Sequence, residues 1–359
     1  MSYFIGKKSY FGLAKQATPG TPETSSDVYI PTEELPDIKS EPANYYAKEF
    51  RGIFSEINNV YRKPTLKSSG KVSMPLYADP MTYLLLGVCG KVESTQVSTE
   101  TGTVDIWMNK YTLAETLPIW TCFIGTIGLD GSGKDLNVER YHDMMMKSMT
   151  ISVKPEENME VSVEMEGASG DIHTGQKTPT YTAKRPLNFA DIQIQIGNDI
   201  NCQTDEFEIT IDRGVQTNRV MCKSGLGAWE PNFMYPTTTS VEGSFTMYFS
   251  DYDEYRYFLG SMQADEMLTD TYREDDASRR LAIQINGQKI EDTQEQRDSL
   301  TFLLNKIYYD DSPIERSFDD RLKITFNFKA GWDPAPPDNT PAAIMELGLV
   351  SQVKGEDIK

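Results

Sequence analysis

The segment Gly128–Asp135, GLDGSGKD, comes closest to a catalytic motif in this sequence. It nearly fits the phosphate-binding pattern GxxxxGK[ST], in which the final hydroxyl ligates Mg²⁺. Here that position holds Asp135, and Asp130 would place a second negative charge beside the phosphates. Both departures predict a polar turn rather than a nucleotide site.

Two histidines, His142 and His173, are the bases available for a nucleophilic triad. His142 lies beside the run Met144–Met146, which predicts core or interface packing, and His173 lies in the polar segment GDIHTGQ. No GxSxG motif accompanies them. We therefore expect no enzyme and no catalytic residue. An acid-dependent glycosidase, which needs two carboxylates in a cleft, is the least favoured alternative.

Cysteines and acidic clusters are the remaining candidates for redox or metal chemistry. The cysteines are Cys89, Cys122, Cys202 and Cys222. Without CxxC spacing they predict buried thiols, although the sequence leaves a disulfide open. The acidic clusters 251–254, 274–276 and 319–320 lack the alternating acids, central glycine and closing glutamate of a calcium loop. We expect no metal site and no cofactor.

Composition narrows the class of protein further. A net charge of −19 argues against a protein that grips nucleic acid, because phosphate binding needs a basic footprint. The length of 359 residues suggests about two domains. The longest apolar run, near Leu84, is far shorter than the roughly 20 residues of a membrane-spanning helix, and the N-terminal residues show no secretory signal.

Two stretches of the chain are copies of one unit. Gly70–Gly87 is GKVSMPLYADPMTYLLLG and Gly243–Gly260 is GSFTMYFSDYDEYRYFLG, and the two align without a gap. The identical pairs are Gly70/Gly243, Met74/Met247, Leu86/Leu259 and Gly87/Gly260. Repetition at this spacing predicts two similar domains on one chain.

Each copy predicts the same order of elements. Val72, Met74 and Leu76 alternate with other residues, as in a half-buried strand. Asp79 and Pro80 then indicate a helix N-cap and first helical position, and Gly87 or Gly90 would end the helix. Further strands are expected over 119–124, 149–153, 159–165, 207–211, 245–249, 281–285, 300–309 and 322–328, with a second helix over 251–259.

Alternating strands are typical of antiparallel sheets with one wet face. We therefore expect a mainly β protein of tandem antiparallel β-sandwich or barrel domains, each with a short flanking helix. The expected segments are an extended N-terminal arm (1–36), two domains (37–185 and 186–335) and a C-terminal tail (336–359). The arm, rich in Pro, Thr, Ser and Glu from Gly12 to Pro36, is either a frayed end or a bridge to a neighbouring subunit.

Several stretches of the sequence resemble a known family. GLAKQATPGTP, YYAKEFRGIFSEINN and SSGKVSMPLYADPMTYLLLG are similar to the tail tube proteins of long-tailed bacteriophages. PLNFADIQIQIGNDINCQTDEFEITIDRG with SVEGSFTMYFSDYDEYRYFLG resembles them again, so the likeness runs from about Gly12 to Gly331. It implies tail-tube sandwich domains whose sheets join around a lumen, and rings that stack into a tube conducting DNA during ejection.

The resemblance also implies partners and a place. The family's rings usually hold six domains, so two per chain favour three chains per ring, with a hexamer as the alternative. The chain would assemble with itself and with other tail proteins in the host cytoplasm, and would reside in the virion tail. A distal tail, baseplate or decoration module built from similar sandwiches is the other structural interpretation.

Acidic residues on alternating strands are the candidates for the lumen wall. They are Glu160, Glu164, Glu166, Glu206, Glu208 and Asp212. Such a wall would let DNA pass without binding, since positive walls would hold phosphate. In the aligned strands, Lys323 and Lys329 take the places of Glu160 and Glu166, so the two copies are expected to differ in charge there.

Overall fold

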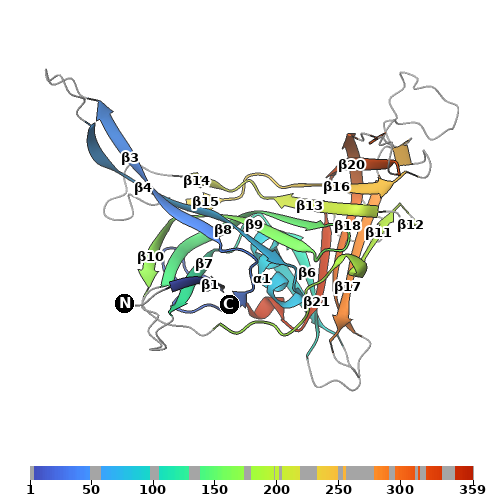
Figure 1. The fold of residues 1–359 in the computed structure, drawn as a ribbon, viewed down its shortest axis with the longest axis horizontal. Helices are drawn as coiled ribbons and strands as arrows, with labels where there is room; N and C mark the ends of the chain where they lie inside the picture. Colours follow the sequence, from blue (N-terminus) through green and yellow to red (C-terminus); the bar gives the residue numbers. More distant parts are fainter. Residues whose placement is uncertain are drawn as a thin grey trace.

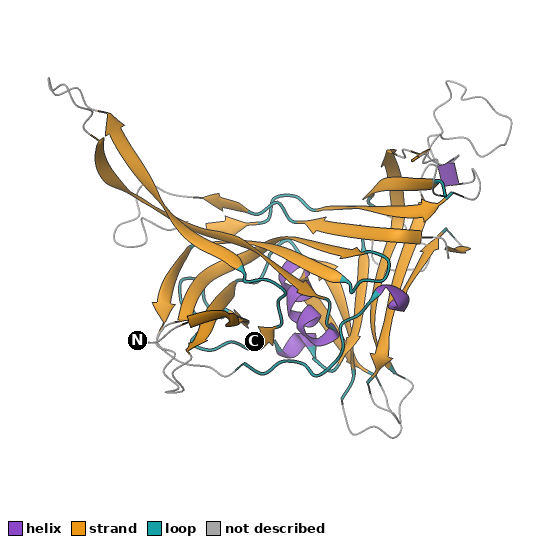
Figure 2. Cartoon of the chain, viewed as in Figure 1, coloured by secondary structure: helices purple, strands orange, loops and turns teal. Residues whose placement is uncertain are grey.

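The computed structural model describes residues 4–48, 58–97, 105–128, 138–173, 179–197, 199–201, 204–218, 233–249, 254–255, 279–290, 296–311, 314–315, 321–333 and 344–358. Within them the protein is mainly β, and all its strand pairs are antiparallel, as the alternation predicted. Figure 2 shows that strands make up most of the described chain, with the helix Ala78–Cys89 packed among them. No described helix is long and apolar enough to cross a membrane.

The chain falls into two successive sets of elements. The first set is β1 (Phe4–Lys15), β2 (Val28–Ile30), β3 (Asp37–Lys48), β4 (Asn58–Pro75), α1 (Ala78–Cys89), β5 (Gly90–Gln96), β6 (Trp107–Leu113), β7 (Trp120–Gly128), β8 (Val138–Val153), β9 (Glu160–Gly167) and β10 (Ser169–His173). The second is η1 (Phe189–Asp191), β11 (Ile192–Ile196), β12 (Asp199–Asn201), β13 (Thr204–Asp212), β14 (Gln216–Asn218), β15 (Phe233–Tyr235), β16 (Ser240–Tyr248), β17 (Arg279–Lys289), β18 (Arg297–Asp311), β19 (Ile314–Glu315), β20 (Lys323–Ala330), β21 (Glu346–Ser351) and η3 (Gly355–Asp357).

The same sheet pattern occurs in both sets (Figure 1). In the first, the strand order β3-β4-β9-β8 forms one layer, and the N-terminal half of β8 turns to pair with β7 and β10 in another. In the second, β13-β16-β20-β18 forms the matching layer, and the N-terminal half of β18 pairs with β17 and β21. β8 and β18 therefore hold corresponding places.

Pairing registers give stronger support to the duplication than the sequence does. Val72 of β4 lies opposite Val163 of β9, and the aligned Phe245 of β16 lies opposite the aligned Phe326 of β20. Gly70 and Gly243 lie opposite Met165 and Phe328, which are also aligned. The predicted strands around these residues are all present, and the two copies use one register.

The shared glycines Gly70 and Gly243 have one physical cause. A Cβ on Gly70 would lie 2.3 Å from the carbonyl oxygen of Asp37, and one on Gly243 would lie 2.4 Å from that of Glu208. Asp37 of β3 and Glu208 of β13 hold corresponding places, opposite the aligned residues Lys71 and Ser244. Each glycine thus lets a neighbouring backbone approach more closely than any side chain allows.

Alanine at either glycine is therefore expected to destabilise the fold. Because the obstructing atoms are backbone, Gly70→Ala and Gly243→Ala should each cost about 1–3 kcal/mol of unfolding free energy, the range for overpacking. Urea denaturation would measure this. Gly348→Ala in β21 is the matched control, since a Cβ there meets nothing within 4 Å. Equal midpoints for all three variants would contradict the close-approach explanation.

The first helix lies where the sequence predicted it, but its N-cap is not the residue that was predicted. α1 begins at Ala78, its N-cap is Tyr77, and no side chain caps it. Asp79, expected as the cap, lies in the first turn, where its carboxylate binds Lys184 and Thr182 instead. Gly90 ends the helix in the left-handed conformation at φ 92°. Most of the second predicted helix lies outside the described residues; Glu254 and Tyr255 are helical.

The N-terminal segment differs from the extended arm expected of it. Residues 4–15 form β1, which pairs with β7 and β2, and Phe11, Leu13 and Ile30 are buried in the main core. The apolar residues Phe11 and Leu13 alternate with Gly12 and Ala14, a pattern the proline-rich remainder obscured. Residues 344–358 likewise form β21 and η3, and β21 pairs with both β18 and β6.

Candidate functional site: the joined sheet

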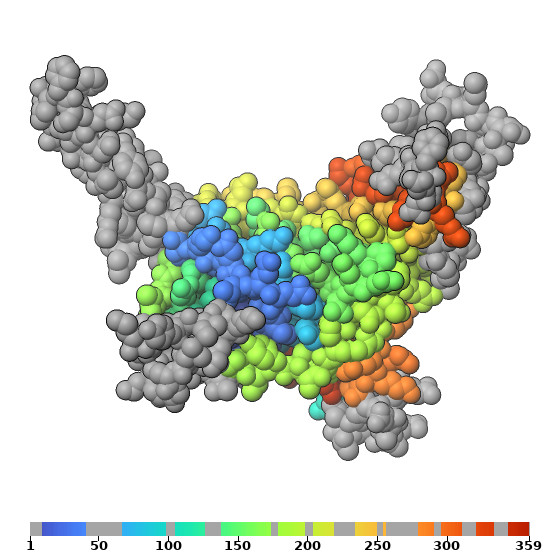
Figure 3. Space-filling model, in the orientation of Figure 1, coloured from blue at the N-terminus to red at the C-terminus, as the bar shows by residue number. Residues whose placement is uncertain are grey.

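The layers of the two sets join into one sheet through β8 and β13. Six residue pairs connect them, from Phe207 opposite Val153 to Asp212 opposite Ser148. The apolar members of these pairs are at most 3% exposed. The result is a continuous eight-stranded layer in the order β3-β4-β9-β8-β13-β16-β20-β18. Described atoms of both sets form one body in Figure 3.

One face of this layer packs on the core, and the other, here called the polar face, carries the alternate residues. Its charged members are Asp37, Lys39, Lys67, Lys71, Lys147, Glu160, Glu164, Glu166, Glu206, Glu208, Asp212, Glu242, Asp310, Lys323 and Lys329. The six acids named as lumen candidates all lie on it. Glu160, Glu164, Glu206 and Glu208 are exposed, Asp212 is half-buried, and Glu166 is 8% exposed.

Hydroxyl groups occupy the middle of the polar face. Thr150 and Thr210 hydrogen-bond across the β8–β13 pair at 2.9 Å, and Thr246 and Thr325 do so across β16 and β20 at the same distance. Ser162 lies opposite Thr150 on the next strand. Uncharged hydroxyls satisfied by one another leave this part of the surface polar without fixed charge.

The outer edges of the layer are β3 and the C-terminal part of β18 with β19. Among the described residues, β3 pairs only with β4, and β19 pairs only with β20. By register, β3 corresponds to β13 and the β18–β19 segment to β8, the two strands that pair with each other inside the chain. Leu35, Tyr308 and Trp332, near these edges, are 56%, 43% and 58% exposed.

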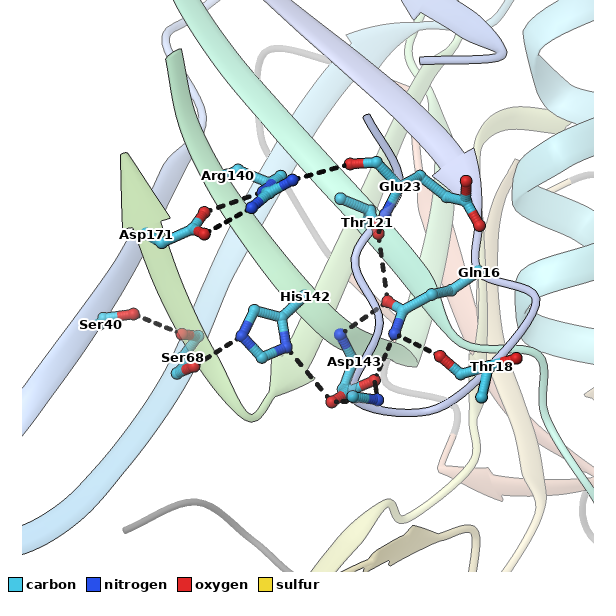
Figure 4. Close-up of polar contacts among 12 residues, drawn as sticks. Gln16, Thr18, Glu23, Ser40, Ser68, Thr121, Arg140, His142, Asp143 and Asp171 are labelled. Atoms are coloured by element: carbon cyan, nitrogen blue, oxygen red, sulfur yellow. Dashed lines mark hydrogen bonds and ion pairs between the residues drawn. The ribbon is translucent and has the colours of Figure 1, made fainter. Parts of the chain in front are cut away.

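A Ser–His–Asp array lies where the N-terminal half of β8 pairs with β10 (Figure 4). Ser169 Oγ lies 2.8 Å from His142 Nε2, and His142 Nδ1 lies 3.2 Å from Asp143 Oδ2. That order matches a hydrolase triad, but Ser169 is buried, at 5% exposed. The carboxylate of Asp143 also accepts hydrogen bonds from Gly20 N and Gln16 Nε2.

This array fastens the N-terminal segment to β8. Asp143 has a φ of 53°, a conformation that costs energy in a non-glycine residue. Burial raises its pKa, but hydrogen bonds from His142 and Gly20 outweigh burial and leave that pKa below its ordinary value. Gln16 Oε1 accepts from Asp143 N and Thr121 Oγ1, which closes the network. The hydrogen bonds of this network hold residues 16–23 against β7 and β8.

Of the other residues singled out in the sequence, the structure describes some and leaves others outside the described residues. Cys89 and Cys122 are buried free thiols as predicted, and burial raises the pKa of Cys89 to about 12. Met144 and Met146 fill the core. Residues 129–135 of the GLDGSGKD segment, Cys202, Cys222 and the acidic clusters apart from Glu254 lie outside the described residues.

Comparison with known proteins decides the family. A family model described as phage tail tube protein matches residues 6–261. The chain belongs to this family. It is thus a structural component of the bacteriophage virion tail that assembles with itself and with other tail proteins, as the sequence resemblance predicted. No curated protein matches the sequence.

One buried and one partly buried cation hold the halves of this tail tube protein together, and sequence reasoning missed both. Arg213, 2% exposed, donates from its guanidinium to the carbonyl oxygens of Val88 and Cys89 at 3.0 and 3.3 Å and to that of Ala114. It thereby ties the end of β13 to the C-terminus of α1. A positive charge also suits that end of the helix dipole.

The second group is a lysine on the segment that links the halves. Lys184 Nζ lies 2.9 Å from Asp79 Oδ1 of α1 and 2.9 Å from Asp298 Oδ1 of β18. Burial raises the pKa of Asp298, and Lys184 opposes that rise. A lone Lys in a polar linker gives no sequence signal of this kind, because the two acids lie more than 100 positions away on either side.

Proposed function

We propose that this protein forms the wall of the tail tube as stacked rings of three chains, and that DNA passes through the lumen during ejection. Each chain supplies two tail-tube domains, with boundaries near residues 37–185 and 186–335. The observation that carries the proposal is the β8–β13 pairing, in which one domain extends the sheet of the next.

Ring closure follows from that internal pairing. The edges β3 and β18–β19, which have no further strand partner among the described residues, correspond to the two strands already joined, so a second chain can repeat the same contact. Exposed strand edges invite uncontrolled association, and closure into a ring removes them. Three chains then reproduce the usual six domains, with only approximate six-fold symmetry.

The polar face is the side proposed to line the lumen. Its opposite face carries the core residues Val72, Val163, Ile151, Ile209 and Phe245, which are covered by the rest of each sandwich. The polar face is therefore the one that a closed barrel can turn inward. Its acids, including Glu160, Glu164, Glu166, Glu206, Glu208 and Asp212, would repel a DNA backbone.

Contact between stacked rings is assigned to a different segment from the one first expected. Residues 4–36 are tied into their own chain by β1, β2 and the Asp143 network. In contrast, β3 and β4 remain paired as far as Lys48 and Asn58 and form a long hairpin that projects from the body (Figure 1). We infer that this hairpin reaches the next ring.

We infer no catalytic role for the protein. The Ser169–His142–Asp143 array is the one arrangement among the described residues that invites the question, and its serine is buried. A conduit needs persistent shape and a surface that does not bind its cargo, which the joined sheet offers without chemistry.

Electron microscopy of the purified full-length protein tests the proposal. We expect tubes whose end-on projections show three-fold symmetry with six similar lobes. Tubes with six chains per ring would refute the stoichiometry but not the function. Single rings or spikes that never stack would favour the distal tail, baseplate or decoration alternative.

A further inference from the structure

Lysines on the polar face lie against carboxylates on that face or beside it. Four form ion pairs, Lys39 with Asp37 at 2.6 Å, Lys67 with Glu166 at 2.8 Å, Lys323 with Asp205 at 2.6 Å and Lys329 with Asp310 at 2.7 Å. Lys71 lies directly opposite Asp37 on β3 and Glu164 on β9. Lys147 lines an open depression of about 370 Å³ together with Glu164 and Glu166.

Ion pairs are present even where corresponding positions of the two copies carry side chains of opposite charge. Glu166 and Lys329 occupy corresponding positions, opposite Ser69 of β4 and Glu242 of β16. Glu166 takes its cation from Lys67, whereas Lys329 takes its anion from Asp310 on β18. Lys323, which corresponds to Glu160, is held by Asp205. Where the sign changes, a partner of opposite sign is present.

Two of these carboxylates are fixed by burial. Glu166 and Asp205 are each 8% exposed, while the side chains of their lysines, Lys67 and Lys323, remain 42% and 28% exposed. A buried acid cannot turn away into water and leave its lysine to another anion. At the surface-exposed pair, the hydrogen bond that Lys329 donates to Asp310 raises the pKa of Lys329, so that ammonium stays charged and paired.

We propose that Asp37, Glu166, Asp205 and Asp310 mask the lysines of the polar face, so that this surface can touch the backbone of duplex DNA without holding it. The identity of the polyanion rests on the proposed function. A lysine binds phosphate by neutralising it and releasing counterions. A lysine already neutralised by a neighbouring carboxylate has much less to gain, and the uncharged Thr and Ser between the pairs add no fixed charge.

Amide substitutions test the masking directly. Glu166→Gln with Asp310→Asn keeps the side-chain shapes and removes the carboxylates that form ion pairs with Lys67 and Lys329. The matched control is Glu160→Gln with Glu208→Gln, which makes the same charge change on the same face, where both acids lie opposite Ser152. Fluorescence anisotropy would measure the affinity of the purified full-length variants for a labelled duplex over a range of salt concentrations.

We expect no measurable binding by the parent and control proteins, and binding by the amide variant with an affinity at least about tenfold above the detection limit. Its logarithmic salt dependence should steepen by about 0.9 for each lysine released. Adding Lys67→Met and Lys329→Met should abolish the gain. Equal affinities in the amide and control variants, or duplex binding by the parent, would overturn the proposal. Because the assay needs no tube, failure to assemble would count against the proposed function alone.

Discussion

A chain carrying Asp37→Cys and Glu315→Cys is expected to become a covalent closed trimer when its assembled tubes are oxidised. The internal seam supplies the register. Glu208 lies opposite Ser152 there, Asp37 corresponds to Glu208, and Glu315 corresponds to Ser152 by their pairing with β20 and β9. Asp37 of one chain should therefore face Glu315 of the next.

The expected yield is high because the geometry suits a disulfide. Directly opposed residues of antiparallel strands have Cα atoms about 4.5 or 5.5 Å apart, inside the 4.4–6.8 Å that disulfides need. A denaturing, non-reducing gel would show monomer converted to a species of three chains. Cys89 and Cys122 are buried thiols that do not compete.

The control moves one cysteine by a single residue. Asp37→Cys with Ile314→Cys places the second thiol on the opposite face of the strand, because side chains alternate. It should form far less covalent trimer in tubes of the same appearance. Equal cross-linking by both pairs, or monomer alone from well-formed tubes, would disprove the proposed contact between these edges and its register. A cross-linked species of six chains would mean that each ring holds six chains and not three.

Lys184→Met is expected to lower the unfolding free energy by about 3–5 kcal/mol, the typical cost of removing one partner from a buried ion pair. The side chains of Lys184, Asp79 and Asp298 are 11%, 19% and 3% exposed. Without the ammonium, two carboxylates would share a poorly solvated site between α1 and β18. Urea unfolding followed by circular dichroism would measure the loss.

The pH dependence of this variant gives a sharper test. Burial raises the pKa of Asp298, so the folded protein binds that proton more tightly than the unfolded chain does. Acidification through that pKa therefore favours the folded state at this site, and more so once Lys184 is gone. The deficit of the variant should be largest near neutral pH and should shrink as pH falls.

Two further variants separate charge from packing. Lys184→Met with Asp298→Asn should recover much of the loss, because it removes the more buried charge. Lys91→Met, whose ion pair with Glu93 is exposed on both sides, should leave the midpoint nearly unchanged. A deficit that is independent of pH and not relieved by Asp298→Asn would point to lost packing by the lysine stem instead.

Local pattern was enough to locate most of the fold. The alternation around Val72, Val163, Ile209 and Phe326 predicted real strands, and the gapless repeat predicted two units of one topology. The N-terminal strand around Phe11 was missed because only part of it alternates and proline-rich sequence follows. The prediction that Asp79 is the N-cap was wrong, because its carboxylate pairs instead with Lys184, which is distant in sequence.

The sequence by itself determined a β-rich, duplicated chain with acids on the solvent side of its strands, because period-two alternation and repetition are local properties. Only the tertiary structure decided how the copies join, which lysines are neutralised, and where Lys184 and Arg213 act. Strand edges, buried ion pairs and helix-end contacts such as those of Asp205, Asp298 and Val88 bring together residues far apart in the chain, and no local pattern encodes them.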